Sequence, residues 1–311
     1  LALKTQRTTP ARPAAPVASW RELAWMGMRF EVPPDWEIVR HGQSTERGSL
    51  VLFDHREQRL EVHWEQAPRT VDVMATMDAL REKSAKRQPE MKFESVSTYN
   101  GWYGFRQAGL SRVARFDPER MLENRLVLMW PQGVDHAVER RVIESFALID
   151  PPPPTKIKEG ELIKYRPTRW RAFGLQITAP AGWALTEVEA RPANITFNFH
   201  HAVYRNQTAA IHRRGMFSQW FSSVQRYLRS RVGYGPEIRI VERVVDGRTI
   251  LRGQSMARTS GFKKMTRGQR QRLDLAWLNE AADAGLCVSV WDNGQEEIEP
   301  EQFEVEAYPL P

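Results

Sequence analysis

The chain has 311 residues, of which 41% are hydrophobic, 27% are charged and 11 are tryptophan. This length suggests about two domains, and the composition excludes an intrinsically disordered protein. The formal net charge is +7, and the longest uninterrupted apolar runs are about five residues. A membrane-spanning helix needs about 20, so we do not expect the chain as given to be an integral membrane protein.

The chain has one cysteine, Cys287, which lies in the apolar run LCVSVW. We expect a buried strand residue rather than a nucleophile, and neither an internal disulfide nor a zinc site built from cysteines. Low cysteine content favours a reducing, cytoplasmic compartment. The N-terminus has no signal peptide pattern. The alternative is an extracytoplasmic location, which would require that a segment before Leu1 has been removed.

The predicted elements of the first half begin after a Pro- and Ala-rich segment, 1–17, which predicts a flexible tail. FEVPPDWEI (Phe30–Ile38) predicts a strand end, a proline-set turn and a core tryptophan. A helix is predicted from about Val71 to Lys86, with Thr70 as its N-cap. Asn100-Gly101 between β-rich flanks predicts a type I′ hairpin turn. The strand RLVLMW and the helix VERRVIESF close this half.

The second half repeats these landmarks. ITAPAGWAL (Ile177–Leu185) follows FEVPPDWEI by 147 residues. An amphipathic helix is predicted from Met216 to Val232, closed by Gly233, and Asp246-Gly247 predicts a second hairpin turn. The strand LCVSVW lies 161 residues after RLVLMW, which indicates an insertion of about 14 residues in the second half. IEPEQFEVE stands where the first half has its closing helix.

The order of these elements predicts an α+β fold with two similar α-β-α sandwich domains. Each domain would be a mainly antiparallel sheet covered by helices. The expected repeats are residues 18–150 and 169–311. The Pro-rich segment 151–168 between them predicts an extended, semi-rigid linker.

The FxVPxxW opening and the closing VIESF helix resemble the PsbP-like superfamily. That group is named for an extrinsic accessory subunit of photosystem II, and it includes a nuclear-import factor that binds the GTPase Ran. The resemblance implies an α-β-α sandwich and a non-enzymatic role attached to another protein. It implies no site residues.

Charge divides the second half into a basic body and an acidic end. Residues 18–150 have 19 basic and 21 acidic residues, residues 151–272 have 23 and 7, and residues 273–311 have none and 10. The insertion is the most basic segment, and no acid interrupts it. Its basic residues, which we take as the candidate partner- or anion-binding site, are Arg252, Arg258, Lys263, Lys264, Arg267, Arg270 and Arg272.

Three interpretations of this basic segment stay open. The acidic segment 273–311 could neutralise it within one domain. It could instead dock the chain, as a non-enzymatic accessory or scaffolding subunit, onto an acidic face of a larger protein assembly. The alternative function is binding of nucleic acid or an anionic membrane surface through the same patch, since phosphate binding by Lys and Arg needs no sequence motif.

No motif for catalysis or a cofactor is present. The chain lacks a phosphate-binding loop, a dinucleotide GxGxxG, HExxH and GxSxG. We therefore expect neither an enzyme, nor a cofactor, nor a metal site. A metal site would be possible if His212 lay beside His200 or His201. His200 and His201 are adjacent on a predicted strand and therefore face opposite sides of it, so they would not share one metal ion.

Outside the predicted helices, six tryptophans lack a tryptophan partner in the repeat. Core placement is the expectation for each of them, and an interface is the alternative. They are Trp20, Trp25, Trp64, Trp102, Trp170 and Trp277.

Overall fold

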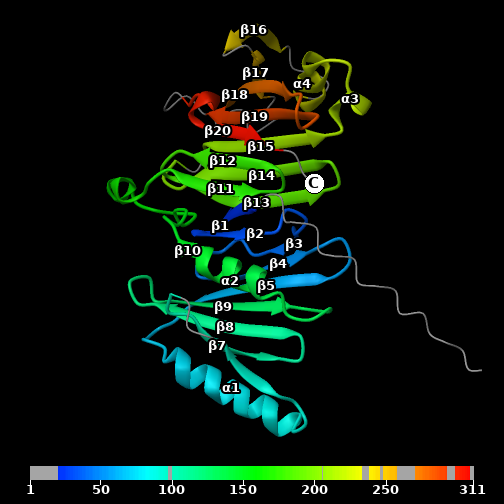
Figure 1. The fold of residues 1–311 in the computed structure, drawn as a ribbon. Helices are drawn as coiled ribbons and strands as arrows, with labels where there is room; N and C mark the ends of the chain where they lie inside the picture. Colours follow the sequence, from blue (N-terminus) through cyan, green and yellow to red (C-terminus); the bar gives the residue numbers. More distant parts are fainter. Residues whose placement is uncertain are drawn as a thin grey trace, which may run out of the picture.

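The computed structural model describes residues 20–96, 100–204, 206–232, 238–245, 248–257, 270–292 and 298–308. Three sheets follow one another along an elongated body (Figure 1). All strand pairs in the described residues are antiparallel.

The first sheet belongs to the first half of the chain. In spatial order its seven strands are β3 (Glu37–His41), β4 (Arg47–Phe53), β5 (Gln58–Gln66), β9 (Leu122–Met129), β8 (Leu110–Asp117), β7 (Tyr103–Gln107) and β6 (Phe93–Val96). One face carries the apolar residues of alternating positions, such as Leu60 and Val62 of β5, into the main core.

The third sheet belongs to the second half and has the same order. Its strands are β13 (Trp183–Arg191), β14 (Asn194–His201), β15 (Thr208–Gly215), β19 (Ala284–Asp292), β18 (Arg270–Asn279), β17 (Arg248–Ala257) and β16 (Arg239–Val245). Irregularities in register lie between Ile38 and Arg40 in β3 and between Leu185 and Glu187 in β13, at positions 147 residues apart. The two sheets therefore correspond residue by residue at this edge.

The central sheet joins the two halves. Its strands in order are β10 (Ala147–Leu148), β2 (Met28–Val32), β1 (Arg21–Trp25), β11 (Thr168–Ala172), β12 (Leu175–Ala179) and β20 (Glu304–Ala307). The hairpin β1–β2 of the first half pairs with the hairpin β11–β12 of the second, with Ala24 opposite Arg171. One hydrophobic core runs through both halves as a result.

The Pro-rich segment between the halves lies against the protein. The backbone N–H of Ile157 donates to the carbonyl of Ala202 at 3.2 Å, and Pro152 and Pro153 are buried. A short 3-10 helix, η1 (Glu159–Lys164), follows. Tyr204 donates its hydroxyl hydrogen to Glu159 of this helix at 3.3 Å.

Helices are few, and the expected α-β-α sandwiches with covering helices are wrong: the chain is mainly β. The α-helices in the described residues are α1 (Val73–Arg87), α2 (His136–Ser145), α3 (Phe217–Trp220) and α4 (Val224–Val232). Of these, α1 packs mainly on β7 and β8 of its sheet, and α2 packs on β2 of the central sheet.

Two individual helix predictions fail for local reasons. The helix expected over 216–232 is interrupted, because Phe221 has extended backbone (φ −135°, ψ 134°) and separates α3 from α4. The last expected helix is only the 3-10 turn η2 (Pro300–Gln302), followed by strand β20. There Val305 pairs with Ile177 in the central sheet, so tertiary pairing overrides the weak helical pattern.

The other local predictions fare better. The helix expected over 71–86 is α1, although Asp72 rather than Thr70 caps it by accepting from the Ala75 N–H at 3.0 Å. Asn100 and Gly101 both have positive φ, 47° and 80°, as a type I′ turn requires. Gly233 and the predicted Asp246-Gly247 turn lie outside the described residues.

Candidate functional site

The outer face of each seven-stranded sheet, opposite the main core, carries a row of polar residues. In the first sheet Ser49, His63 and Arg125 are register partners on β4, β5 and β9. In the third sheet Thr196, His212 and Cys287 form the corresponding row on β14, β15 and β19. Corresponding positions of the two faces can therefore be compared directly.

The face of the third sheet is closed by α3 and α4. Phe217 of α3 and Tyr227 and Leu228 of α4 pack against Ala276 and Cys287 of the sheet. Glycines allow this close approach, since an added Cβ at Gly285 would lie 2.4 Å from the Phe217 ring. Gly253 likewise leaves room for Leu228, which would lie 3.2 Å from an added Cβ.

Gly285→Ala is expected to lower the free energy of unfolding by about 1–3 kcal/mol, because the buried Phe217 ring must move. Denaturant unfolding measures the change. Gly160→Ala is the matched control, because nothing lies within 4 Å of its added Cβ. Equal stability of the Gly285→Ala protein and the wild type would contradict the tight helix–sheet contact.

A buried polar network lies beneath α4. The Arg272 guanidinium pairs with Asp274 at 2.8 Å, and the Ser289 hydroxyl donates to the same carboxylate at 2.5 Å. Asp274 and Ser289 are fully buried, and the Cys287 Sγ lies 4.0 Å from the Asp274 carboxylate. The set contains the residue types of a Cys-His-Asp triad. However, burial raises the pKa of the Cys287 thiol to about 12, so it is not a thiolate at neutral pH.

His212 belongs to the same buried face. Its ring accepts a hydrogen bond from Arg231 of α4, whose Nη2 lies 2.6 Å from Nε2, and Thr196 Oγ1 lies 3.0 Å from Nδ1. Burial, together with the positive charges of Arg231 and then Arg272, lowers the pKa of His212 to about 2. The imidazole is therefore neutral in the folded protein and has a structural role.

This lowered pKa predicts a loss of stability in acid. The unfolded chain binds a proton at His212 as the pH falls below about 6.5, whereas the folded chain does not until about 2. Protonation of His212 in the unfolded chain should therefore lower the free energy of unfolding by about 2 kcal/mol between pH 7 and pH 5. Denaturant unfolding of wild type and His212→Gln across this range measures the difference in slope. Parallel curves for the two proteins would contradict the prediction.

The corresponding face of the first sheet is open. The positions of Gly253 and Gly285 are held there by Phe105 and Glu123, and α1 rests on Phe105 through Met77. Side chains too large for close helix approach thus leave α1 over β7 and β8. The side chains of His63 and Arg125 are 45% and 49% exposed, whereas Cys287 is fully buried and His212 is 5% exposed.

A groove of about 420 Å³ lies between α1 and this open face, and we call it the α1 groove. Met77 and Leu80 of α1 form its wall. Its floor and rim are formed by Arg47, Gly48, His63, Trp64, Glu65, Arg112, Val113, Glu123, Arg125, Leu126 and Val127.

Arginine is in excess over acid in the α1 groove. Arg125 donates two hydrogen bonds to Glu123, at 2.7 and 2.8 Å, and these raise the pKa of Arg125. Arg47 lies 3.8 Å from Glu65. Arg112 is half-buried and has no ion pair or hydrogen bond to another side chain of the described residues. Among the described residues, one positive charge of the groove lining, that of Arg112, therefore has no partner.

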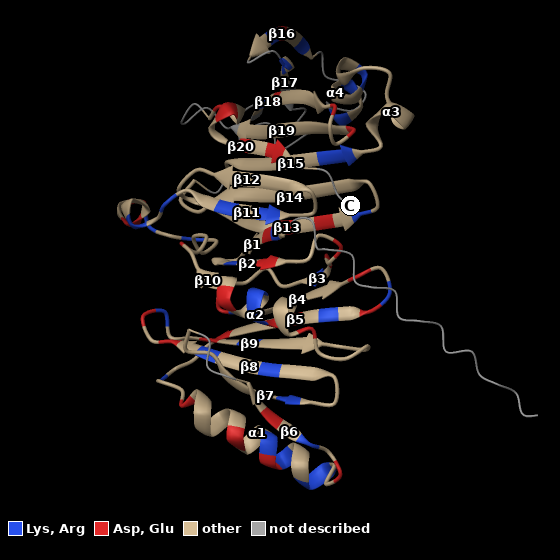
Figure 2. Ribbon diagram, viewed as in Figure 1, with Lys and Arg blue, Asp and Glu red and all other residues tan. Residues whose placement is uncertain are grey.

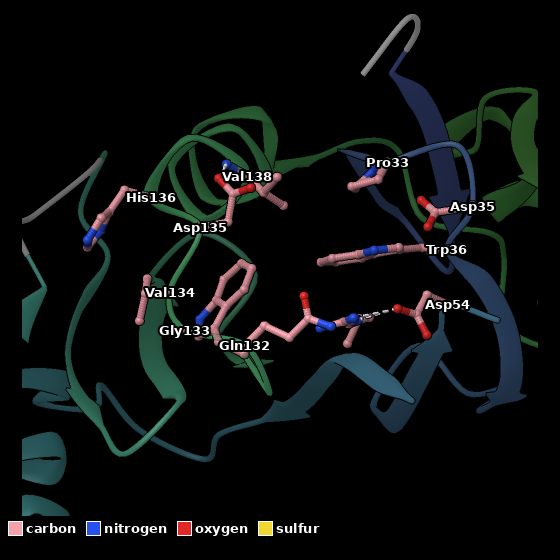
Figure 3. A pocket seen from close by; sticks show the side chains of 12 residues that line it. Pro33, Asp35, Trp36, Asp54, Gln132, Gly133, Val134, Asp135, His136 and Val138 are labelled. Atoms are coloured by element: carbon pink, nitrogen blue, oxygen red, sulfur yellow. Dashed lines mark hydrogen bonds and ion pairs between the residues drawn. The ribbon is translucent and has the colours of Figure 1, made fainter. Parts of the chain in front are cut away.

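A second pocket, of about 690 Å³, lies at the FEVPPDW turn. In Figure 3 Pro33, Trp36 and Asp54 line one side, and Val134 and His136 lie on the other. Two of its three carboxylates have structural partners: Asp135 caps α2 by accepting from Val138 N–H at 3.0 Å, and Asp54 accepts from Arg59 Nε at 2.6 Å. Burial would raise the pKa of Asp54, but backbone hydrogen bonds and Arg59 outweigh it and lower the pKa.

The corresponding place in the second half is filled. Gly182 stands where the first half has Asp35, and Leu162 of η1 would lie 2.5 Å from an added Cβ on Gly182. Both the turn and the outer sheet face are therefore occupied in the second half by its own chain. The first half leaves both of them accessible.

Of the seven residues predicted to bind a partner, the described residues show side-chain contacts for two. Arg252 on β17 lies 3.3 Å from Glu301 and also pairs with Glu299, and Arg272 pairs with Asp274. In Figure 2 the short strand β20, which follows Glu299 and Glu301 along the chain, carries acidic residues. Arg270 begins β18, and the others lie outside the described residues: Arg258, Lys263, Lys264 and Arg267. Asp274, Glu299 and Glu301 thus pair with two of the predicted residues, Arg252 and Arg272.

The three histidines of the alternative metal site do not converge. His200 and His201 point to opposite faces of β14, and His212 pairs with Thr196, four residues before His200 on that strand. In the part of the chain that is described, no three His, Cys, Asp or Glu side chains are grouped to hold a metal ion. Likewise, none of the helices described here is long and apolar enough to cross a membrane.

The sequence analysis did not single out the α1 groove. Its signal was the alternation in ENRLVL, where charged Glu123 and Arg125 share one face and Leu126 and Leu128 lie on the core side. Such alternation predicts an uncovered sheet face. The apolar run LCVSVW of the second half lacks it, as expected for a strand covered on both faces.

Comparison with known proteins gives little. No protein-family model matches the chain, and no curated protein matches it. One solved structure that it resembles is immunity protein TplEi of T6SS from Pseudomonas aeruginosa complexed with "L" peptide. The identity is 12%, the match covers 94% of this chain and 91% of that chain, and the TM-score is 0.35. A likeness of this degree supports no argument about function.

Proposed function

We propose that the chain is a non-enzymatic accessory subunit that binds a larger protein assembly. One observation carries this proposal: the outer face of the first sheet is open, whereas the same face of the third sheet is closed by α3 and α4. An open face with an apolar wall and an unpaired arginine is typical of a surface that a partner covers.

The location differs from the basic segment that the sequence suggested. Arg252 and Arg272 are engaged with acids of their own chain, so they have less charge to offer a partner. In the α1 groove, by contrast, Leu80 is 37% exposed beside the unpaired Arg112. We therefore place the docking surface on the first half.

Arg112→Glu is expected to weaken binding of the partner at least tenfold, which corresponds to about 1.4 kcal/mol, and so to reduce its co-purification. The measurement is affinity purification from the source organism with quantitative mass spectrometry. Leu80→Glu should reduce co-purification of the same partner, because it places a charge on the apolar wall of the groove.

Controls for this purification are Arg56→Glu and Ile163→Glu, since Arg56 is exposed outside the groove and Ile163 is 83% exposed on η1. Both should retain the partner. The groove assignment is wrong if the Arg112 and Leu80 variants retain it. It is also wrong if charge reversal of Lys263, Lys264, Arg267 and Arg270 is what removes it.

A second candidate function is binding of an anionic polymer or membrane surface by the second half. It is favoured by Arg239, Arg243 and Arg248 on the β16–β17 hairpin, which are exposed and have no ion pair with a described residue. Titrations with single-stranded nucleic acid and with anionic vesicles, repeated across salt concentrations, test this function. No binding at low salt would exclude it.

A further inference from the structure

We infer that the α1 groove receives an amphipathic α-helix of the partner, with an acidic side chain directed at Arg112. This inference rests on the proposed function and specifies what the partner presents. The second half supplies the first argument, because its own helix α4 packs there on β17, β18 and β19 and reaches His212 of β15 through Arg231. The first half has the same sheet, and in its described residues α1 packs closely on β7 and β8 but not on β5 or β9.

The spacing of the sheet fits a helix beside α1. Helix α1 lies over β7 and β8, and the next two strands are β9 and β5. Strands lie about 4.8 Å apart, so a position two strands further along is roughly 9–10 Å from α1. Packed helices have interaxial distances of about 8–10 Å. A helix over β9 and β5 would therefore pack against the Leu80 flank of α1.

The charges of the α1 groove select an acidic helix. Arg47 and Arg125 lie next to Glu65 and Glu123, which leaves Arg112 as the unmatched charge of the lining. Lys83 and Arg87 follow Leu80 on α1 at i+3 and i+7, so they lie along the same flank. Both are exposed and have no ion pair with a described residue.

Two 18-residue model peptides with leucines at i, i+3, i+4 and i+7 test the inference directly. One has glutamates at the flanking positions, and the other has lysines. Fluorescence anisotropy with the full chain should show at least tenfold tighter binding of the glutamate peptide. Circular dichroism should show that this peptide is helical when bound.

Arg112→Gln should weaken binding of the glutamate peptide about tenfold. Arg56→Gln should change the affinity for this peptide by less than twofold. The inference is overturned if neither peptide binds, if both bind equally, or if Arg112→Gln and Arg56→Gln have the same effect. Loss of the natural partner with Arg112→Glu but no binding of the model helix would leave the proposed function standing. In that case the partner presents a different structure to the groove.

Discussion

Asp274→Ala is expected to lower the free energy of unfolding by about 3–5 kcal/mol. The side chain is fully buried and pairs with Arg272, which is itself 12% exposed. Removing the carboxylate leaves a buried guanidinium without its counter-charge, and the Ser289 hydroxyl loses its acceptor. Denaturant unfolding at neutral pH measures the loss.

Arg252→Ala is the matched comparison for this buried pair. Arg252 also pairs with acids of the C-terminal segment, but its side chain is 25% exposed and those of Glu299 and Glu301 are 33% and 44% exposed. Solvent screens such pairs, so the expected cost is about 1 kcal/mol or less. Similar losses for Asp274→Ala and Arg252→Ala would contradict the buried network.

Trp25→Ala is expected to cost about 3–5 kcal/mol, because it removes a fully buried indole from the contact between the two halves. Trp25 ends β1 of the first half, and its ring centroid lies 6.1 Å from that of Phe173 and 6.2 Å from that of Phe197 in the second. Its indole N–H also donates to the Gly42 carbonyl at 2.8 Å. Calorimetry should show a lower Tm with a single transition, as expected for one shared core.

Trp220→Ala serves as the control for size and residue type. Trp220 is 57% exposed on α3, and Arg214 lies over its ring at 4.7 Å. Its removal should cost about 1 kcal/mol or less. If Trp25→Ala shows two separate transitions with only one of them shifted, the halves do not share a core.

Part of this architecture could be predicted from the sequence. The 147-residue offset between Trp36 and Trp183 is repeated by corresponding register irregularities in β3 and β13. The Asn100-Gly101 turn was predicted correctly, because only a few residue types adopt positive φ at two consecutive positions.

The fold class could not be predicted in this way, because it depends on contacts between distant segments. The hairpins β1–β2 and β11–β12 join in one central sheet, and this pairing has no local signal. The closing helix of the second half was predicted wrongly, since Val305 and its neighbours form a strand against β12. The PsbP-like resemblance rested on short motifs and stays an untested expectation.

The α1 groove could not be predicted from the sequence for a related reason. Charge counts drew attention to the basic segment 252–272, of which Arg252 and Arg272 pair with Glu299 and Asp274. The α1 groove depends instead on two substitutions between corresponding positions, Phe105 for Gly253 and Glu123 for Gly285. Their effect on helix approach is visible only when the two sheets are compared.

The central claim is that the open face of the first sheet is the docking surface. Hydrogen exchange of the chain alone and in complex with its co-purified partner tests it most directly. We predict slower exchange in the complex at α1, β5 and β9, residues 73–87, 58–66 and 122–129. Unchanged exchange in these segments, with slower exchange confined to residues 239–257 and 270–279, would contradict the claim.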